Sequence, residues 1–310
     1  MGVISLTPEG QPELVWYKTI MAMPSRVFRT YYRLTKPGII YGNAITASAG
    51  FLLASNGHVN VALFGAMLLG LSLVIASACV FNNYLDRGID AVMARTRKRA
   101  LVTGKVSGRA ALTYASALGL LGITVLVVYT NLLAAGIAAF GFVAYVVLYG
   151  WGKRHSIYGT EIGSVAGAVP PVVGYTAVTG YLDAGALILF LILVFWQMPH
   201  FFAIATYRLD DYSAAKLPVL PAAKGLRRTR IEMLMYIVAF ILAALSLAVF
   251  DYTGVSYEII AGLLGLGWIW VWASGRNAPN PAAWARGMFK YSLLVITVLS
   301  VAIAFGRILP

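Results

Sequence analysis

Oxygen-bearing side chains recur at every fourth residue in one short stretch of this sequence, at Asn82, Asp86 and Asp90. On an α-helix, each step of four residues climbs about 6 Å and rotates by only about 40°. The three side chains therefore share one face of the predicted helix. Carboxylate and amide oxygens are ligands that divalent cations accept, so the stretch predicts a Mg²⁺ site.

Basic residues come directly after this acidic stripe: Arg87, Arg95, Arg97, Lys98 and Arg99. Their charged groups are suited to phosphate, and acids beside bases are what a metal-bound diphosphate requires. A simpler interpretation is that the acids end a helix where it meets water. Against it, acids near a helix C-terminus cost a few tenths of a kcal/mol unless a cation is bound there.

The composition places these residues in a membrane protein. Of 310 residues, 60% are hydrophobic and only 11% are charged, against about 25% in soluble domains. Several apolar runs reach the roughly 20 residues that a membrane-spanning helix needs. The net charge of +13 lies in loops between these runs, which favours membrane orientation over nucleic-acid binding. The single Cys79 excludes an internal disulfide.

The hydropathy pattern predicts an all-α polytopic protein with nine transmembrane helices. Residues 1–30 are expected to form a cytoplasmic N-terminal tail, and residues 31–310 a single nine-helix domain. The predicted spans are approximately 38–56, 60–83, 109–129, 132–150, 161–179, 183–206, 231–250, 256–274 and 289–306.

Loop charges predict the orientation. Alternate connectors contain no Lys or Arg, and 23 of the 24 basic residues fall on the opposite side, Arg307 being the exception. The positive-inside rule then predicts a cytoplasmic N-terminus and an external C-terminus in the cell (plasma) membrane. Spans two, four and six would all end at the cytoplasmic face. Their ends carry the acidic stripe, the pair Lys153 and Arg154, and the pair Asp210 and Asp211.

The acidic stripe and the loop after it resemble the signature of the UbiA-type intramembrane prenyltransferases. The matching residues are Asn82, Asp86, Ile89, Asp90, Met93, Arg95, Thr96, Arg99 and Gly104. Three further segments resemble one branch of that family, the protohaem IX farnesyltransferases: residues 34–37, residues 163–171, and residues 196–202 through 210–212. The resemblance covers roughly residues 30–305.

The resemblance implies a UbiA-like helical bundle that transfers a farnesyl group from farnesyl diphosphate to a vinyl carbon of haem b. Water addition would complete haem O, with haem b as substrate rather than cofactor. Asn82, Asp86 and Asp90 inherit the Mg²⁺-binding role. Arg95, Arg99, Lys153 and Arg154 are the candidate phosphate contacts, although loop bases also serve topology alone.

A second acidic motif departs from the wider family, in which many members carry Asp-x3-Asp at the end of span six. Here Tyr207 takes the first position, which leaves Asp211 as the matched carboxylate and metal ligand, with Asp210 beside it. A symmetric two-metal site is therefore in doubt. Tyr207 is retained as a substrate contact, and the two acids are either catalytic or a helix cap.

Two histidines are candidate haem contacts. His200 lies in predicted span six, where a histidine is costly unless it is partnered or useful. It would ligate the haem iron or position the porphyrin, unless it only donates to a backbone carbonyl. His155 comes directly after Lys153 and Arg154, so it would meet either a haem propionate or water.

Three alternatives stay open. Another UbiA-type prenyltransferase would act on an aromatic or quinone precursor. A secondary transporter would place its acids near the bilayer midplane, whereas these acids lie at helix ends. A non-catalytic haem-binding subunit would not need the acidic stripe. Expected partners are membrane lipids and, by resemblance alone, a haem A synthase or terminal oxidase.

Overall fold

The structure, a computed structural model, describes residues 26–275 and 278–306. Within this part every regular element is helical, and nine helices are long and apolar enough to cross a membrane. The predicted all-α, nine-span fold is therefore confirmed. The spans are α2 (Pro37–Ser55), α3 (Val61–Leu85), α5 (Gly108–Tyr129), Leu132–His155, Gly159–Thr179, α10 (Ala184–Tyr207), α12 (Leu220–Val249), α13 (Val255–Ala273) and α14 (Pro281–Phe305).

Two of the spans are interrupted. Span four consists of α6 (Leu132–Val143), a π-helical segment η1 (Ala144–Tyr149) and α7 (Gly150–His155). Span five consists of α8 (Gly159–Gly167) and α9 (Val169–Thr179). The second break precedes Pro170 and Pro171, which have no backbone N–H to continue the helix and are favoured in a first turn.

Two helices begin earlier than hydropathy predicts. The helix α12 starts at Leu220 instead of 231, and α14 starts at Pro281 instead of 289. Hydropathy detects only an uninterrupted apolar run, whereas basic residues follow the first turn of each helix: Lys224, Arg227, Arg228 and Arg230 in α12, and Arg286 in α14. The first turn of α12 is also set off from the rest of the helix by a kink at Gly225, where φ is 74°. Capping marks the true start of α14, because the Asn280 side chain accepts a hydrogen bond from the backbone N–H of Ala283.

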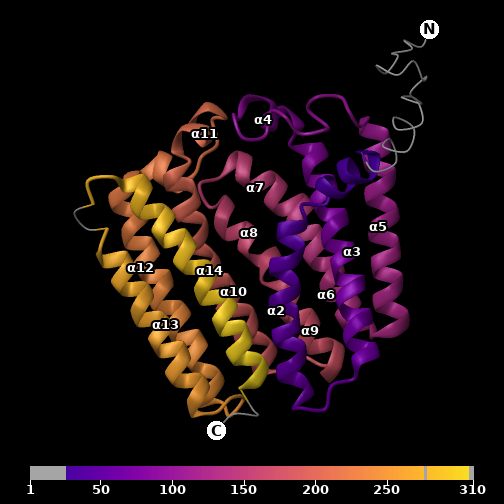
Figure 1. The fold of residues 1–310 in the computed structure, drawn as a ribbon, viewed down its shortest axis with the longest axis vertical. Helices are drawn as coiled ribbons and strands as arrows, with labels where there is room; N and C mark the ends of the chain where they lie inside the picture. The colour runs from indigo at the N-terminus through magenta and orange to yellow at the C-terminus, as the bar shows by residue number, and fades with distance from the viewer. Residues whose placement is uncertain (1–25, 276–277, 307–310) are drawn as a thin grey trace, which may run out of the picture.

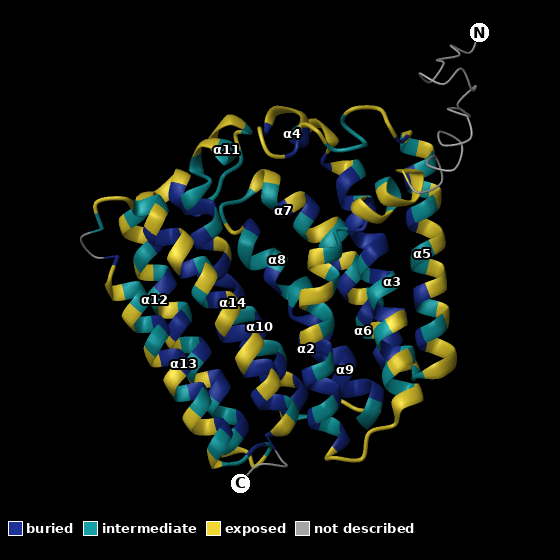
Figure 2. Cartoon of the chain, in the orientation of Figure 1, coloured by how far each residue is buried: buried dark blue, intermediate teal, exposed yellow. Residues whose placement is uncertain are grey.

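The spans lie side by side in two halves (Figure 1), and contacts between the halves close them into a ring. The helices α10, α12, α13 and α14 contact one another on one side, and α3, α5, α6 and α9 do so on the other. The ring closes where α2 packs against α14 and where α10 packs against α8 and α9. Buried residues face the neighbouring helices, and exposed residues cover the outer faces and the ends (Figure 2).

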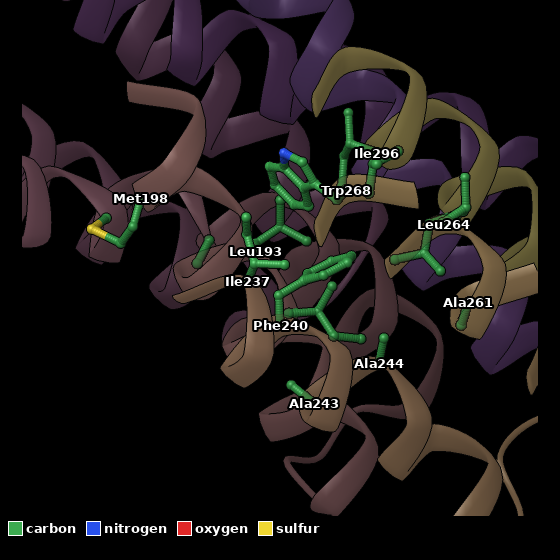
Figure 3. Close-up of a cluster of buried hydrophobic side chains, with 14 of the residues drawn as sticks. Leu193, Met198, Ile237, Phe240, Ala243, Ala244, Ala261, Leu264, Trp268 and Ile296 are labelled. Atoms are coloured by element: carbon green, nitrogen blue, oxygen red, sulfur yellow. The ribbon is translucent and has the colours of Figure 1, made fainter. Parts of the chain in front are cut away.

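The main hydrophobic cluster lies in the half built from α10, α12, α13 and α14 (Figure 3). Its largest fully buried side chain is Trp268, whose indole meets Phe240 edge-on at a centroid distance of 5.4 Å. A second cluster, with Phe51 and Met67 among its members, fills the space between α2, α3, α6 and α9.

Three short helical segments gather at one end of the bundle: α4 (Arg87–Val92), α7 and α11 (Leu209–Ala214) (Figure 1). Spans two, four and six therefore end together, which brings their polar ends to the same side. Residues 26–34 are helical and lie at this end too. The predicted tail is otherwise residues 1–25, which lie outside the described residues, as does Arg307.

Close helix crossings depend on small residues. A Cβ atom at Gly50 of α2 would lie 2.1 Å from the backbone oxygen of Pro171, and one at Gly174 of α9 would lie 2.0 Å from that of Ala47. Neither oxygen belongs to a flexible side chain. The α2–α9 crossing therefore requires glycine on both helices.

We predict that Gly50→Ala destabilises the bundle by at least about 2 kcal/mol, because overpacking against backbone is not relieved by a rotamer change. Gly42→Ala is the matched control on the same helix, since a Cβ there meets nothing within 4 Å. The check is thermal unfolding in detergent: Gly50→Ala should melt several degrees lower and Gly42→Ala should melt like wild type. Equal melting temperatures would contradict the packing assignment.

Candidate active site

The acidic stripe crosses the junction of α3 and α4. Asp86 ends one helix and precedes the next, yet its backbone N–H donates to Asn82 O at 2.9 Å, and that of Asp90 donates to Asp86 O at 2.8 Å. The four-residue spacing is thus helical throughout. The three residues are 3%, 9% and 5% exposed, which is unusual for acids and shows that the stripe faces protein.

Asp86 is held by two bases from span four. Lys153 Nζ donates to its Oδ2 at 2.5 Å, and Arg154 Nη2 donates to its Oδ1 at 3.0 Å. Arg154 also donates to the carbonyl of Leu85 at 2.8 Å. Both bases lie in α7, directly after the π-helical segment, and Lys153 Nζ sits 5.0 Å from the Tyr149 ring centroid. Such π segments are frequent at functional sites, and this one ends where the helix that carries both bases begins.

Asp90 is held by its own loop. Arg99 Nη1 donates to Asp90 Oδ2 at 2.6 Å and to Asn83 Oδ1 at 3.2 Å. The amide of Asn83 donates in turn to the carbonyl of Leu34 at 2.8 Å, and the Thr96 hydroxyl donates to the carbonyl of Asp90 at 3.0 Å. The loop of the family signature therefore folds back onto the stripe, which brings Arg99 among the acids.

Lys36 completes the group, although sequence reasoning does not select it. Its Nζ donates to Asn82 Oδ1 at 3.0 Å, from a backbone position with φ 53° just before Pro37. Burial lowers the pKa of Lys36 to about 8. The one sequence feature that could have selected Lys36 is its place in segment 34–37, which resembles the family. Its charge in a loop indicates no more than a base that sets membrane orientation. The amide nitrogen of the Asn82 side chain, Nδ2, is buried and has no hydrogen-bond partner among the described residues.

The second acidic motif, Asp210 and Asp211, lies at the same end of the bundle as the acidic stripe. Its carboxylates do not form one cluster with Asp86 and Asp90. Asp211 lies 3.7 Å from Arg208 in a partly exposed pair, and Asp210 is exposed. Beside them burial raises the pKa of Tyr212, and the positive charges of Arg95 and Arg208 oppose that rise. Among the described residues, no three His, Cys, Asp or Glu side chains could together hold a metal.

The remaining predicted contacts occupy different surroundings. His200 is buried in α10, with its Nδ1 2.7 Å from Ser292 Oγ of α14. Tyr207, about two helical turns nearer the polar end, meets Phe289 edge-on at 5.9 Å. His155 is exposed and stacks on Trp151, and Arg95 is exposed as well.

The donor set fits a magnesium ion that a substrate brings with it. Mg²⁺ is usually held by one or two carboxylates together with phosphate oxygens rather than by an all-protein cage. Asp86 and Asp90 supply two carboxylates, and Asn82 supplies an amide. The orphaned Asn82 Nδ2 is shielded from water and is an unused N–H donor, which suits a phosphate oxygen rather than the metal.

These features define a polytopic membrane protein with a buried acid–base site at one end of its helical bundle. Residues 43–294 match the UbiA prenyltransferase family, and the chain belongs to that family.

The chain is similar to curated relatives along nearly all of its length. It is 50% identical over 278 residues to protoheme IX farnesyltransferase of Protochlamydia amoebophila, covering 90% of this chain and 98% of the relative. It is 48% identical over 285 residues to the protein of that name from Photorhabdus laumondii, covering 92% and 97%.

Solved structures share the fold at lower identity. A structure of digeranylgeranylglyceryl phosphate synthase superposes with a TM-score of 0.75 at 20% identity, covering 91% of this chain and 98% of the other. A UbiA homolog from Archaeoglobus fulgidus bound to GPP and Mg²⁺ gives 0.63 at 15%, covering 89% and 99%. At these identities the likeness establishes the fold alone.

We predict that Lys36→Met raises the KM for a prenyl diphosphate about tenfold or more, because one charged hydrogen bond in a buried site is lost. Lys98→Met is the matched control, since Lys98 is an exposed base of the signature loop. Steady-state kinetics on both variants provide the check. If Lys36→Met and wild type have equal KM values, Lys36 does not bind the diphosphate and serves only to set the membrane orientation.

Proposed function

We propose that this protein is a haem O synthase. It transfers the farnesyl group of farnesyl diphosphate to a vinyl carbon of haem b, with addition of water, and releases diphosphate. The observation that carries the proposal is the identity of about 50% to relatives named protoheme IX farnesyltransferase over about 90% of the chain. The buried acids and bases at one end of the bundle support it, because both substrates are anionic amphiphiles.

The bases of the site bind the diphosphate. Lys36, Lys153 and Arg99 already lie against the acidic stripe, and Arg154 lies at its rim. When the diphosphate enters, these groups exchange part of their contact with carboxylates for contact with phosphate oxygens. Charge-assisted hydrogen bonds of this kind are about twice as strong as neutral ones. They stabilise the negative charge that grows on the leaving group.

Asp86 and Asp90, with Asn82, are the residues that would hold Mg²⁺ in this proposal. A bound Mg²⁺ would supply Lewis-acid stabilisation of the diphosphate. The role of the protein residues is to fix the carboxylates, which their ion pairs with Lys153 and Arg99 achieve before substrate arrives. Asp211 is proposed as a further ligand from the second motif, with Asp210 beside it.

The reaction then balances without a covalent step on the protein. The bond between the farnesyl carbon and the diphosphate oxygen breaks, and its electron pair leaves with the diphosphate. The π electrons of the vinyl group form the new carbon–carbon bond. Water adds to the remaining electron-poor carbon and loses a proton, which gives the hydroxyethylfarnesyl group. Exclusion of water until that point protects the allylic cation.

Haem b is placed by the α10–α14 side of the ring in this proposal. His200 of α10 contacts the porphyrin iron, and Tyr207 contacts the substrate nearer the polar end. His155 is proposed to meet a propionate from the exposed end of α7. The protein would lie in the plasma membrane with this end toward the cytoplasm, since its loops are the basic ones. Its product would pass to a haem A synthase or a terminal oxidase.

The direct test is an assay of purified protein with haem b, farnesyl diphosphate and Mg²⁺, followed by mass spectrometry of the extracted haem. The expected product is heavier by a farnesyl group and a hydroxyl group, and it is absent when EDTA is added. Farnesyl diphosphate hydrolysis with unmodified haem would retain the diphosphate site and reject haem b as acceptor. An aromatic or quinone precursor would then be screened.

We predict that Asp86→Asn and Asp90→Asn each lower the farnesyl transfer rate about 100-fold or more, since each removes a charge at the leaving group. Glu258→Gln is the control, because Glu258 is exposed at the start of α13. Rates are compared after size-exclusion chromatography confirms folded protein. Full activity in either aspartate variant would remove the acidic stripe from the mechanism.

A further inference from the structure

The contact between His200 and Ser292 joins α10 to α14 in the buried part of the ring. Ser292 is 0% exposed and His200 is 8% exposed. The Nδ1 atom of His200 lies 2.7 Å from Ser292 Oγ, and that hydroxyl donates to the carbonyl of Phe289 at 2.6 Å. The serine oxygen therefore has a backbone acceptor on one side and an imidazole nitrogen on the other.

This arrangement favours one tautomer of the His200 imidazole. A hydroxyl group has a single hydrogen, and that of Ser292 is used on Phe289 O. With that hydrogen on Phe289 O, only lone pairs face His200, and Nδ1 is the donor in the contact between the two side chains. Within the described residues His200 makes no ion pair, and a buried imidazolium without a counter-ion is costly. The neutral ring then carries its single hydrogen on Nδ1, and Nε2 keeps its lone pair.

The same segment also fixes the plane of the ring. Trp196 stacks on His200 at a centroid distance of 4.7 Å, and its indole N–H donates to the backbone carbonyl of Ser292 at 2.8 Å. Phe289 and Phe201 close two more sides at 5.0 Å and 5.1 Å. The orientation of the imidazole thus depends on these three aromatic rings, and its tautomer depends on the Ser292 hydroxyl.

We propose that Ser292 is a positioning residue that locks His200 as the Nδ1–H tautomer, so that Nε2 presents its lone pair to the iron of the porphyrin substrate. The inference rests on the proposed function, because it takes haem b as the acceptor. A metal-bound histidine nearly always donates its other N–H to a fixed acceptor, and loss of that acceptor typically costs 10–100-fold in metal affinity. The Ser292 hydroxyl supplies such an acceptor in the interior of the bundle.

The test is a haem b titration of purified protein, with absorption and electron paramagnetic resonance spectra of the bound haem. Ser292→Ala should weaken haem binding about tenfold and reduce the histidine-ligated signal, with the KM for farnesyl diphosphate unchanged. Ser292→Thr retains a hydroxyl and should restore the wild-type spectrum. Ser300→Ala removes another buried serine of α14 and should behave as wild type. His200→Ala should lose the signal entirely.

The outcomes separate this inference from the proposed function. If wild-type protein makes the farnesylated haem and Ser292→Ala binds haem with unchanged affinity and spectrum, the positioning role is wrong and the proposed function stands. If wild-type protein neither binds nor modifies haem b, both are wrong. If Ser292→Ala and Ser292→Thr both melt early and weaken both substrates alike, Ser292 has only a packing role, which also overturns the inference.

Discussion

Carboxylates that leave water at a membrane boundary must be paired, and the site is built around that requirement. Asp86 and Asp90 are almost fully buried, and each has a base within 2.6 Å. Removing one partner of such a pair typically costs about 3–5 kcal/mol, because an uncompensated charge is left behind. The bases that pair the acids come from two separate parts of the chain, the end of span four and the loop after α4, and Lys36 before α2 joins the same stripe through Asn82. Pairing the acids therefore brings these segments together.

The same pairs explain how the site can accept a charged substrate. A diphosphate with its cation is nearly neutral as a unit, and it replaces carboxylate–base contacts with phosphate–base and carboxylate–cation contacts. The number of contacts between opposite charges changes little. Binding of the diphosphate therefore leaves no buried charge without a partner. The other half of the ring differs in character. Around His200 the walls are aromatic and α10 meets α14 through Trp196, Ser292 and Phe289, which suits a flat, largely apolar acceptor.

Much of the fold can be predicted from hydropathy and charge, because apolar length and loop bases are local properties. The nine spans, the stripe spacing and the meeting of spans two, four and six were all predictable. The early start of α12 was not, since its first turn is separated from the apolar run by a kink at Gly225 and by the basic residues that follow it. Lys36 was missed because its role depends on a contact with a residue 46 positions away. The Nδ1 partner of His200 lies 92 positions away and was hidden for the same reason. Asp211 matches its family's motif, yet in the described structure its partner is Arg208.

The central claim is that the buried acids and bases form one diphosphate site. Calorimetric titration of the purified protein with inorganic diphosphate, with and without Mg²⁺, tests it most directly, using wild type and Lys153→Met. We expect wild-type protein to bind diphosphate only with Mg²⁺ present, and farnesyl diphosphate to compete for the same site. The folded Lys153→Met variant should bind at least about tenfold more weakly, since a charged contact in a buried site is lost. Equal diphosphate binding by the two proteins, or binding that ignores Mg²⁺, would contradict the account.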